Sequence, residues 1–186
     1  MSGISSVTVY CGSAPGSDPS YLKLAQKLGK AIAARGWRTV YGGGNVGLMG
    51  AVATSARDSG GKVLGVMPHF LRELEGVLDG IENRYTDNMH QRKQALLDEA
   101  DGLIVLPGGI GTLEEAVETL SWAKLSLHSK PMAFLSENNY WRPYFTLVDH
   151  MIEGGFLPES FRQLMADTST PEAALEALHQ RAIVLG

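Results

Sequence analysis

The sequence has a single cysteine, Cys11, among its 186 residues, and its five histidines show neither an HExxH pattern nor Cys–His ligand spacing. One cysteine cannot form a disulfide within the chain. Zinc sites in proteins need closely spaced cysteine and histidine ligands, and those spacings are missing here. We therefore expect neither an internal disulfide nor a bound metal ion.

Long hydrophobic runs are absent as well. The longest apolar stretches, such as residues 103–106 and 132–135, have the length of strands, far below the roughly 18 residues that a membrane-spanning helix needs. The N-terminal residues lack a positively charged region followed by an apolar one, so the sequence predicts no secretory signal. We expect a soluble, cytoplasmic protein with no membrane partner.

The sequence also lacks an excess of basic residues. Sixteen Lys and Arg stand against twenty Asp and Glu, a net charge of -4, without the basic stripe that binds a phosphate backbone. We therefore expect no nucleic-acid partner. The fractions of hydrophobic residues (44%) and charged residues (19%) are those of a globular protein, and the length suits one domain, which we expect to span residues 1–186.

Short β-branched runs alternate with longer helical patterns along most of the chain, and glycine or proline closes most of them. This alternation is typical of repeated βαβ units and predicts an α/β fold, a parallel sheet sandwiched between helices. The pattern weakens between residues 69 and 87. The predicted strands are 6–11, 39–41, 62–66, 103–106 and 132–135; the predicted helices are 21–35, 48–59, 89–100, 112–125, one within 141–153 and one from 171.

Glycines are concentrated after three of the predicted strands, in residues 11–13, 42–47 and 107–112. In an open parallel sheet, ligands bind beyond the carboxyl ends of the strands. The three loops are therefore expected to share one site, which includes Gly12, Ser13, Gly43 and Gly44. The alternative is that these glycines only form tight turns between strands and helices.

Two familiar nucleotide motifs fit the second loop poorly. Gly42, Gly44 and Gly47 match G-x-G-x-x-G, but the region about 20 residues further on, 65–68, has no acidic residue to bind a ribose hydroxyl. A P-loop would need Lys and Ser or Thr where the sequence has Leu48 and Met49. Neither a dinucleotide nor a triphosphate is therefore expected.

The third loop favours a single phosphate group. Gly108, Gly109 and Gly111 let the backbone bend closely around a ligand, and a helix is predicted to begin at Thr112. The start of a helix has unpaired N–H donors and a partial positive charge, both of which favour an anion, and the Thr112 hydroxyl adds another donor.

Glu115, which follows this loop, has two interpretations. It completes a capping box with Thr112, in which the Glu115 carboxylate would reach back to the Thr112 N–H. In the other interpretation it lies beside the sugar of the ligand, where the helix dipole keeps it ionised as a base or as a stabiliser of positive charge. Glu114 lies next to it and is a second candidate contact.

The predicted helix 89–100 carries a second polar cluster. Met89, Arg92 and Leu96 share one face, so Arg92 emerges beside an apolar stripe. Arg92 either reaches solvent or a structural carboxylate, or it enters the glycine-lined cleft and meets Glu115 or an anionic substrate. Lys93 is expected to be a solvated neighbour or a secondary contact for an anion.

The run 107–115, PGGIGTLEE, resembles the PGGxGTxxE signature of the LOG family, the cytokinin riboside 5′-monophosphate phosphoribohydrolases. Members of this family were long labelled possible lysine decarboxylases. The resemblance extends through residues 11–13, residues 42–50 and Arg92–Lys93, and it covers the chain from the first predicted strand to Pro131.

The resemblance implies a Rossmann-like fold, a homodimer, and hydrolysis of the N-glycosidic bond of AMP or an N6-prenylated AMP without metal or redox cofactor. It implies Arg92 and Glu115 as the catalytic pair. The substrate and its phosphate would contact Gly12, Ser13, Gly43, Gly44, Met89, Lys93, Gly108, Gly109, Ile110, Gly111, Thr112 and Glu114. Ile110 replaces a frequent aromatic and Ser126 a frequent glycine, which affects the expected preference for the base.

Two other functions remain open at this point. Related folds bind the molybdenum cofactor, so a non-catalytic carrier of a nucleotide or of that cofactor is an alternative. Retention of both Arg92 and Glu115 argues against a carrier. A decarboxylase would need a lysine that forms a Schiff base with pyridoxal phosphate, and Lys93 is the only lysine within the motifs.

Overall fold

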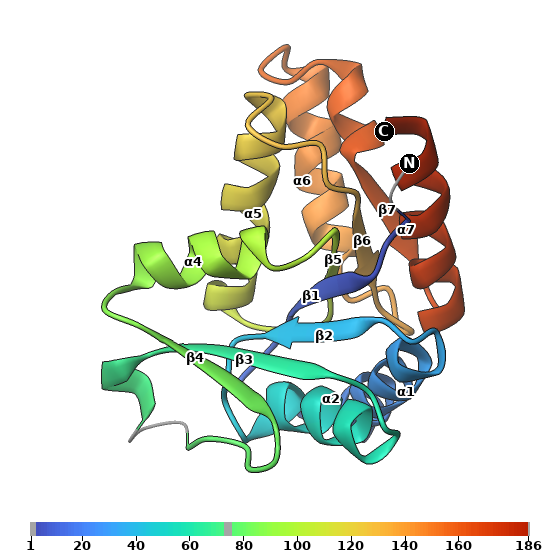
Figure 1. Cartoon of the computed structure of the whole chain (residues 1–186). Coiled ribbons are helices and arrows are strands. Elements are labelled where there is room, and N and C mark those ends of the chain that lie inside the picture. The colour runs from blue at the N-terminus through green and yellow to red at the C-terminus, as the bar shows by residue number, and fades with distance from the viewer. Residues whose placement is uncertain (1–2, 73–75, 186) are drawn as a thin grey trace.

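A seven-stranded sheet, all of whose pairs are parallel, forms the centre of the computed structural model, which describes residues 3–72 and 76–185 (Figure 1). The strands lie in the order β4-β3-β2-β1-β5-β6-β7. They are β1 Ser6–Tyr10, β2 Arg38–Tyr41, β3 Val63–Pro68, β4 Glu82–Thr86, β5 Gly102–Val105, β6 Met132–Leu135 and β7 Met165–Thr168.

Helices cover both faces of the sheet and make it the middle layer of three (Figure 1). They are α1 Pro19–Ala34, α2 Gly47–Asp58, α4 Met89–Asp98, α5 Ile110–Lys124, α6 Arg142–Glu153 and α7 Pro171–Leu185, with short 3-10 helices η1 His69–Leu71 and η2 Glu159–Leu164. One hydrophobic core lies under α1, α2 and α7, and a second lies under α4, α5 and α6. Alternate residues of β1 serve the two cores: Val7 and Val9 belong to the first, Tyr10 to the second.

The predicted fold class is confirmed, and the predicted strands and helices are present with ends that differ by one or two residues. Two strands, β4 and β7, were missed. Both lie at the edges of the sheet, and β4 has the polar sequence ENRYT, of which Glu82 and Arg84 are exposed. Because an edge strand is partly open to water, it needs no continuous apolar run. Residues 1–2, within the segment judged to lack a secretory signal, and 73–75, within the weak stretch, lie outside the described residues.

The helices of the described chain include none that combines the length and the hydropathy needed to cross a membrane.

The order of the strands sets the position of the candidate site. From β1 the chain proceeds to β2 on one side, whereas β5 lies on the other side of β1. The segments that follow β1 and β5 therefore lead to opposite faces and leave a crevice between them, where ligands bind in folds of this class. Two of the three predicted glycine loops flank this crevice.

The helices α1 and α2 cross in close contact at Gly29. A Cβ atom at this position would lie 2.3 Å from the carbonyl oxygen of Val52 and 2.9 Å from the amide nitrogen of Ala56. At the same crossing, the Ser55 hydroxyl donates to the carbonyl oxygen of Gln26 at 2.7 Å. Backbone contact, which cannot yield as a flexible side chain does, therefore sets the spacing of these two helices.

We expect Gly29→Ala to lower the free energy of unfolding by about 1–3 kcal/mol, although alanine favours helices, because the added methyl group forces the helices apart. Gly111→Ala, whose Cβ meets nothing within 4 Å, is the control and should change stability by less than about 0.5 kcal/mol. Urea unfolding followed by circular dichroism measures both. Equal stabilities of the two variants would contradict the close crossing.

Candidate functional site

The three glycine loops meet at the carboxyl ends of β1, β2 and β5, as the sequence predicts. The Gly12 N–H donates to the Pro107 carbonyl oxygen at 3.1 Å, and the Gly12 carbonyl oxygen accepts from the N–H groups of Leu48 at 3.0 Å and Met49 at 3.3 Å. Gly12 is therefore hydrogen-bonded both to Pro107, just after β5, and to the start of α2. Main-chain hydrogen bonds hold the three loops together.

Close approach explains why glycine is needed at two of these positions. Gly47 has φ 59°, and a Cβ there would lie 2.3 Å from the Ser13 carbonyl oxygen. A Cβ on Gly108 would lie 2.1 Å from the Thr112 hydroxyl oxygen. Any side chain at Gly47 would separate the first loop from the second, and one at Gly108 would displace the buried Thr112 side chain.

A cavity of about 360 Å³ opens at this junction. Gly12, Ser13, Ala14, Gly16, Ser17, Tyr21, Leu48, Pro107, Gly108, Gly109 and Tyr140 line it. It lies between the starts of α1 and α5. The start of α1 is already capped, because Asp18 accepts the Ser20 N–H and Pro19 has no N–H.

The start of α5 supplies the free donors of this cavity region. No side chain caps the helix at Gly109. Within the described chain, the N–H groups of Gly109, Ile110, Gly111 and Thr112 donate to no protein acceptor. Unpaired donors at a helix start, together with the helix dipole, form an anion site.

Arg92 and Glu115 form a buried ion pair beside these loops. The Arg92 Nη1 donates to the Glu115 Oε1 at 2.8 Å, and their side chains are 7% and 11% exposed. The same guanidinium donates through Nε to the Val66 carbonyl oxygen at 3.2 Å and through Nη2 to the Gly42 carbonyl oxygen at 3.3 Å. Arg92 of α4 thus contacts α5, the end of β3 and the loop after β2. Of the two interpretations of Arg92, the structure supports the one in which it meets Glu115.

The capping box predicted for Thr112 and Glu115 is wrong. The N-cap residue of α5 is Gly109, so Thr112 is already the third helical residue, and the Glu115 carboxylate bonds to Arg92 instead. The helix begins earlier than predicted because Ile110 and Gly111 also take up helical backbone angles. Glu115 therefore lies in the second turn, where the helix dipole acts on it only weakly.

Burial raises the pKa of the Glu115 carboxyl above its ordinary value, and the adjacent Arg92 guanidinium opposes this rise. From the sequence, the helix dipole alone predicts an ionised Glu115, because the dipole lowers the pKa of a carboxyl. In the folded protein the loss of hydration on burial is the larger effect on this pKa.

A second contact holds the α5 turn that carries Glu115 against the sheet. The Thr119 hydroxyl donates to the Glu115 carbonyl oxygen at 2.8 Å. The oxygen of Thr119 lies 3.1 Å from the Tyr10 hydroxyl oxygen in the buried interior. Because the single hydroxyl proton of Thr119 is used by Glu115, Tyr10 is the donor in this bond. The end of β1 is thus linked to the backbone of Glu115.

For Lys93 the sequence predicts either a solvated neighbour or a secondary contact for an anion, and the first of these is wrong. Its Nζ lies 2.6 Å from the Glu114 Oε1 and 2.9 Å from the Glu118 Oε2. Burial alone would lower the pKa of the Lys93 amine, but the two glutamates outweigh burial and the pKa is raised. Lys93 and Glu114 therefore pair with each other across α4 and α5, and Glu118, which the sequence analysis did not name, completes the cluster.

Several of the other predicted contact residues lie outside the described lining of the 360 Å³ cavity. Gly43 and Gly44 are buried, and a Cβ on Gly43 would lie 2.9 Å from the Cβ of Met67 on β3. Met89 is partly exposed, and Ile110 is 82% exposed. The described lining of the 360 Å³ cavity contains Gly12, Ser13, Gly108 and Gly109 but none of Gly43, Gly44, Met89, Ile110, Arg92 or Glu115. The predicted residues thus divide into an anion pocket and a neighbouring ion pair.

Two tyrosines of the pocket were missed by the sequence analysis. Tyr140 donates through its hydroxyl to the Gly108 carbonyl oxygen at 2.6 Å. Its ring lies edge-on to that of Tyr21, with the ring centres 5.6 Å apart. Tyr140 precedes α6, far along the chain from every glycine loop, so no local pattern connects it with the site.

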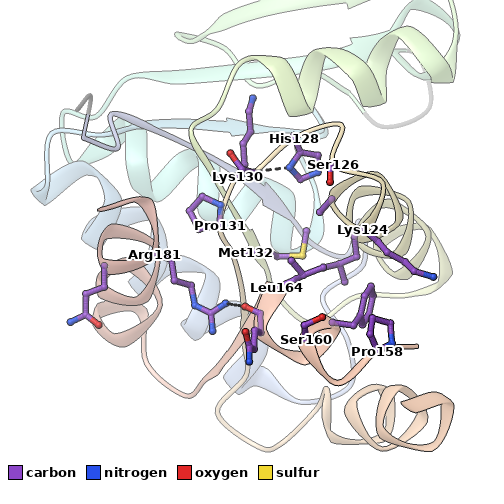
Figure 2. Close-up of a pocket in the computed structure, with 16 residues that line it drawn as sticks. Lys124, Ser126, His128, Lys130, Pro131, Met132, Pro158, Ser160, Leu164 and Arg181 are labelled. Carbon is purple, nitrogen blue, oxygen red and sulfur yellow. Dashed lines mark hydrogen bonds between the residues drawn. The ribbon is translucent and has the colours of Figure 1, made fainter. Parts of the chain in front are cut away.

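A larger cavity, of about 860 Å³, lies at the opposite edge of the sheet, where β6 begins (Figure 2). None of its sixteen described lining residues is a predicted site residue. Two of its cations have structural partners: Lys130 donates to the carbonyl oxygen of Leu97 near the end of α4, and Arg181 donates to those of Gln163 and Met165. Figure 2 shows the Lys130 side chain directed away from Arg181 and Ser160. The carboxyl edge of the sheet therefore holds the candidate site.

Within the described residues, no three His, Cys, Asp or Glu side chains form a group suited to a metal ion.

Comparison with known proteins gives consistent matches over most of the chain. A family model described as "Possible lysine decarboxylase" matches residues 49–178. The cytokinin riboside 5′-monophosphate phosphoribohydrolase of Rhodococcoides fascians is 42% identical over 93% of this chain and 88% of that protein. Enzymes of the same name are 42% identical in Oryza sativa subsp. japonica, over 88% of this chain and 68% of that protein, and 38% identical in Arabidopsis thaliana, over 95% and 82%.

Solved structures share the fold. The molybdenum cofactor carrier protein of Chlamydomonas reinhardtii aligns with a TM-score of 0.73 over 96% of this chain and 98% of that chain, at 23% identity. The molybdenum cofactor binding protein of Rippkaea orientalis aligns with a TM-score of 0.69 over 96% and 95%, also at 23% identity. At this level of identity the likeness concerns the fold alone.

The contact between Arg92 and Glu115 predicts how the pKa of the Glu115 carboxyl responds to substitution of Arg92. We expect the pKa of Glu115, followed by carbon-13 NMR, to lie above the ordinary value of about 4.3. Arg92→Gln should raise it further, because the variant removes the positive charge that favours the ionised carboxylate, whereas Arg92→Lys, which keeps a charge, should raise it less. A pKa that falls or stays constant in Arg92→Gln would show that Arg92 is not the opposing charge.

Proposed function

Because the chain belongs to the LOG family, the cytokinin riboside 5′-monophosphate phosphoribohydrolases, we propose that it hydrolyses the N-glycosidic bond of a purine riboside 5′-monophosphate. The substrate is AMP or an N6-prenylated AMP, and the products are the free base and ribose 5-phosphate. One observation carries the proposal: the buried Arg92–Glu115 pair lies beside a helix start with four unpaired N–H donors. We assign this activity to residues 1–186 as a single nucleotide-binding domain.

The start of α5 binds the 5′-phosphate in this proposal. Gly109, Ile110, Gly111 and Thr112 bring their unpaired N–H groups, and Thr112 its hydroxyl, to a position where the helix dipole also favours an anion. Gly108 lines the adjoining pocket. Gly12 and Ser13 line the same pocket. The phosphate does not react, so its binding energy can be used to hold the sugar in position for the chemical step.

Glu115 acts at the sugar. It lies six residues beyond Gly109, about 9 Å along the axis of α5, which leaves room for a ribose between the phosphate and the carboxylate. Cleavage of the C1′–N bond gives the ribose an oxocarbenium-like character, which the carboxylate stabilises. Water adds its oxygen to C1′ while the bonding electron pair leaves with the base; one water proton passes to the base, directly or through Glu115.

Arg92 orients Glu115. Three of its five N–H donors are used by the Glu115 carboxylate, Val66 and Gly42. The planar guanidinium therefore fixes the carboxylate relative to the ends of β2 and β3, and its charge favours the ionised form that the proposed reaction needs. Gly43, Gly44, Met89 and the side chain of Ile110 are proposed to contact the nucleoside.

The alternative functions receive less support. The likeness to molybdenum cofactor proteins concerns the fold alone, and a carrier has no need for a buried carboxylate held by an arginine at the sugar position. A Schiff base requires a neutral lysine amine, whereas Lys93 is held as a cation by Glu114 and Glu118. An absorbance spectrum of the purified protein would detect a bound molybdenum cofactor or pyridoxal phosphate.

We also propose that the protein acts as a cytoplasmic homodimer, without a nucleic-acid or membrane partner. Exposed apolar side chains on α5 and in the turn after it, Val117, Leu125 and Leu127, support the dimer, because a second copy would remove them from water. The net charge of -4 supports the absence of a nucleic-acid partner.

Glu115→Gln should reduce kcat for AMP about 100-fold or more while AMP still binds, because the amide keeps the shape of the side chain and loses its charge. Glu118→Gln, one turn further along the same helix, is the matched control and should retain most of the activity. Release of adenine and ribose 5-phosphate measures both variants. Near-normal turnover by a folded Glu115→Gln protein would leave Glu115 with a structural role only.

We expect the number of phosphate groups on the substrate to determine whether it reacts. With adenosine, the donors at the start of α5 remain unpaired, and sites of this kind reject a truncated analogue by about 10⁴-fold. ATP should also be poor, because Leu48 and Met49 occupy the positions of the P-loop lysine and hydroxyl. The measurement is kcat/KM for base release from adenosine, AMP and ATP. Equal values for adenosine and AMP would exclude a phosphate anchor at α5.

A further inference from the structure

Tyr140 reaches the phosphate loop from a distant part of the chain. It lies between β6 and α6, directly after Asn139, whose φ of 53° turns the backbone sharply. Its ring packs edge-on against Tyr21 and Trp141, with ring centres 5.6 Å and 5.1 Å away. The hydroxyl donates to the carbonyl oxygen of Gly108 at 2.6 Å. This is the one hydrogen bond, among the described residues, that a side chain makes to the backbone of residues 107–111.

This bond acts on the peptide group that joins Gly108 to Gly109. The peptide bonds of the described chain are trans, so the Gly108 carbonyl and the Gly109 N–H point in opposite directions from one rigid plane. Neither residue has a side chain to restrict rotation of that plane. Fixing the carbonyl on Tyr140 therefore also fixes the direction of the Gly109 N–H.

The direction of this peptide matters for an anion. The Gly109 N–H is the first of the four unpaired donors at the start of α5. If the plane turned over, a carbonyl oxygen with partial negative charge would replace that donor and repel a phosphate. The Tyr140 hydroxyl, bonded to the carbonyl at the opposite end of this peptide group, prevents this exchange before the ligand arrives.

We propose that Tyr140 is a positioning residue for phosphate binding: its hydroxyl holds the Gly108–Gly109 peptide with the Gly109 N–H directed at the anion. The proposal rests on the proposed function only in that the ligand is a phosphate monoester. It differs from a purely structural role, in which Tyr140 would anchor its own loop and leave phosphate affinity unaffected. Packing against Tyr21 and Trp141 holds the ring in place without the hydroxyl, so removal of the hydroxyl alone tests the bond to Gly108.

The test is Tyr140→Phe, which keeps the ring and removes only the hydroxyl. Isothermal titration calorimetry should show affinities for AMP and for inorganic phosphate that are both about fivefold to tenfold weaker, the usual effect of one lost hydrogen bond. KM for AMP should rise by a similar factor, whereas kcat should change less than about twofold, because the Arg92–Glu115 pair is untouched.

Tyr144→Phe is the matched control. Tyr144 lies four residues further on, in α6, packs against Phe134 and lies outside the described lining of the pocket. It should leave both affinities unchanged. Unchanged affinity for phosphate in Tyr140→Phe would overturn the proposal, and so would a loss of AMP affinity without a loss of phosphate affinity, since Tyr140 would then act on the base or sugar.

The binding measurement separates this proposal from the proposed function. If the wild-type protein binds AMP and phosphate but releases no adenine, the hydrolase assignment fails, and the two dissociation constants still decide the role of Tyr140. If the wild-type protein binds neither, both proposals fail together.

Discussion

The guanidinium of Arg92 is the contact on which the candidate site depends. It joins four parts of the chain, α4, α5, the end of β3 and the loop after β2, within one set of hydrogen bonds. A charge removed from water costs several kcal/mol unless it is paired and hydrogen-bonded, and here the Glu115 carboxylate and two carbonyl oxygens provide those partners. Removing the guanidinium would leave the Glu115 carboxylate buried without its counter-charge, and removing the carboxylate would leave the guanidinium without its own. The loops and the Glu115 carboxylate are therefore coupled.

In the proposed function, the first and second turns of helix α5 have different roles. Its first turn has unpaired N–H donors and the strongest part of the helix dipole, which suits a phosphate. Its second turn carries Glu115, where the dipole is weak and the protonation of the carboxyl depends on burial and on Arg92 instead. Separation of the two along one rigid helix lets an anion and a carboxylate belong to the same site without direct repulsion.

The two edges of the sheet also differ in which backbone groups the helices leave unpaired. Helix starts gather at the carboxyl edge, with free N–H donors, whereas helix ends gather at the opposite edge, with free carbonyl oxygens. Lys130, which lines the 860 Å³ cavity, donates to one such carbonyl, that of Leu97 near the end of α4. The smaller cavity at the carboxyl edge is therefore the better candidate for an anionic ligand, although it has less than half the volume.

The sequence by itself determined the alternation of strands and helices, the three glycine loops and the candidate pair Arg92 and Glu115, because strand and helix periods and the need for glycine in tight turns are local properties. Only the tertiary structure decided where α5 begins, that Lys93 pairs with Glu114 and Glu118, and that Tyr140 bonds to Gly108. It also decided the direction of the Glu115 pKa shift, because loss of hydration depends on what packs against a side chain. Contacts between residues far apart in the chain leave no pattern of spacing in the sequence. The edge strands β4 and β7 were missed because pairing with the sheet, and not a continuous apolar run, defines them.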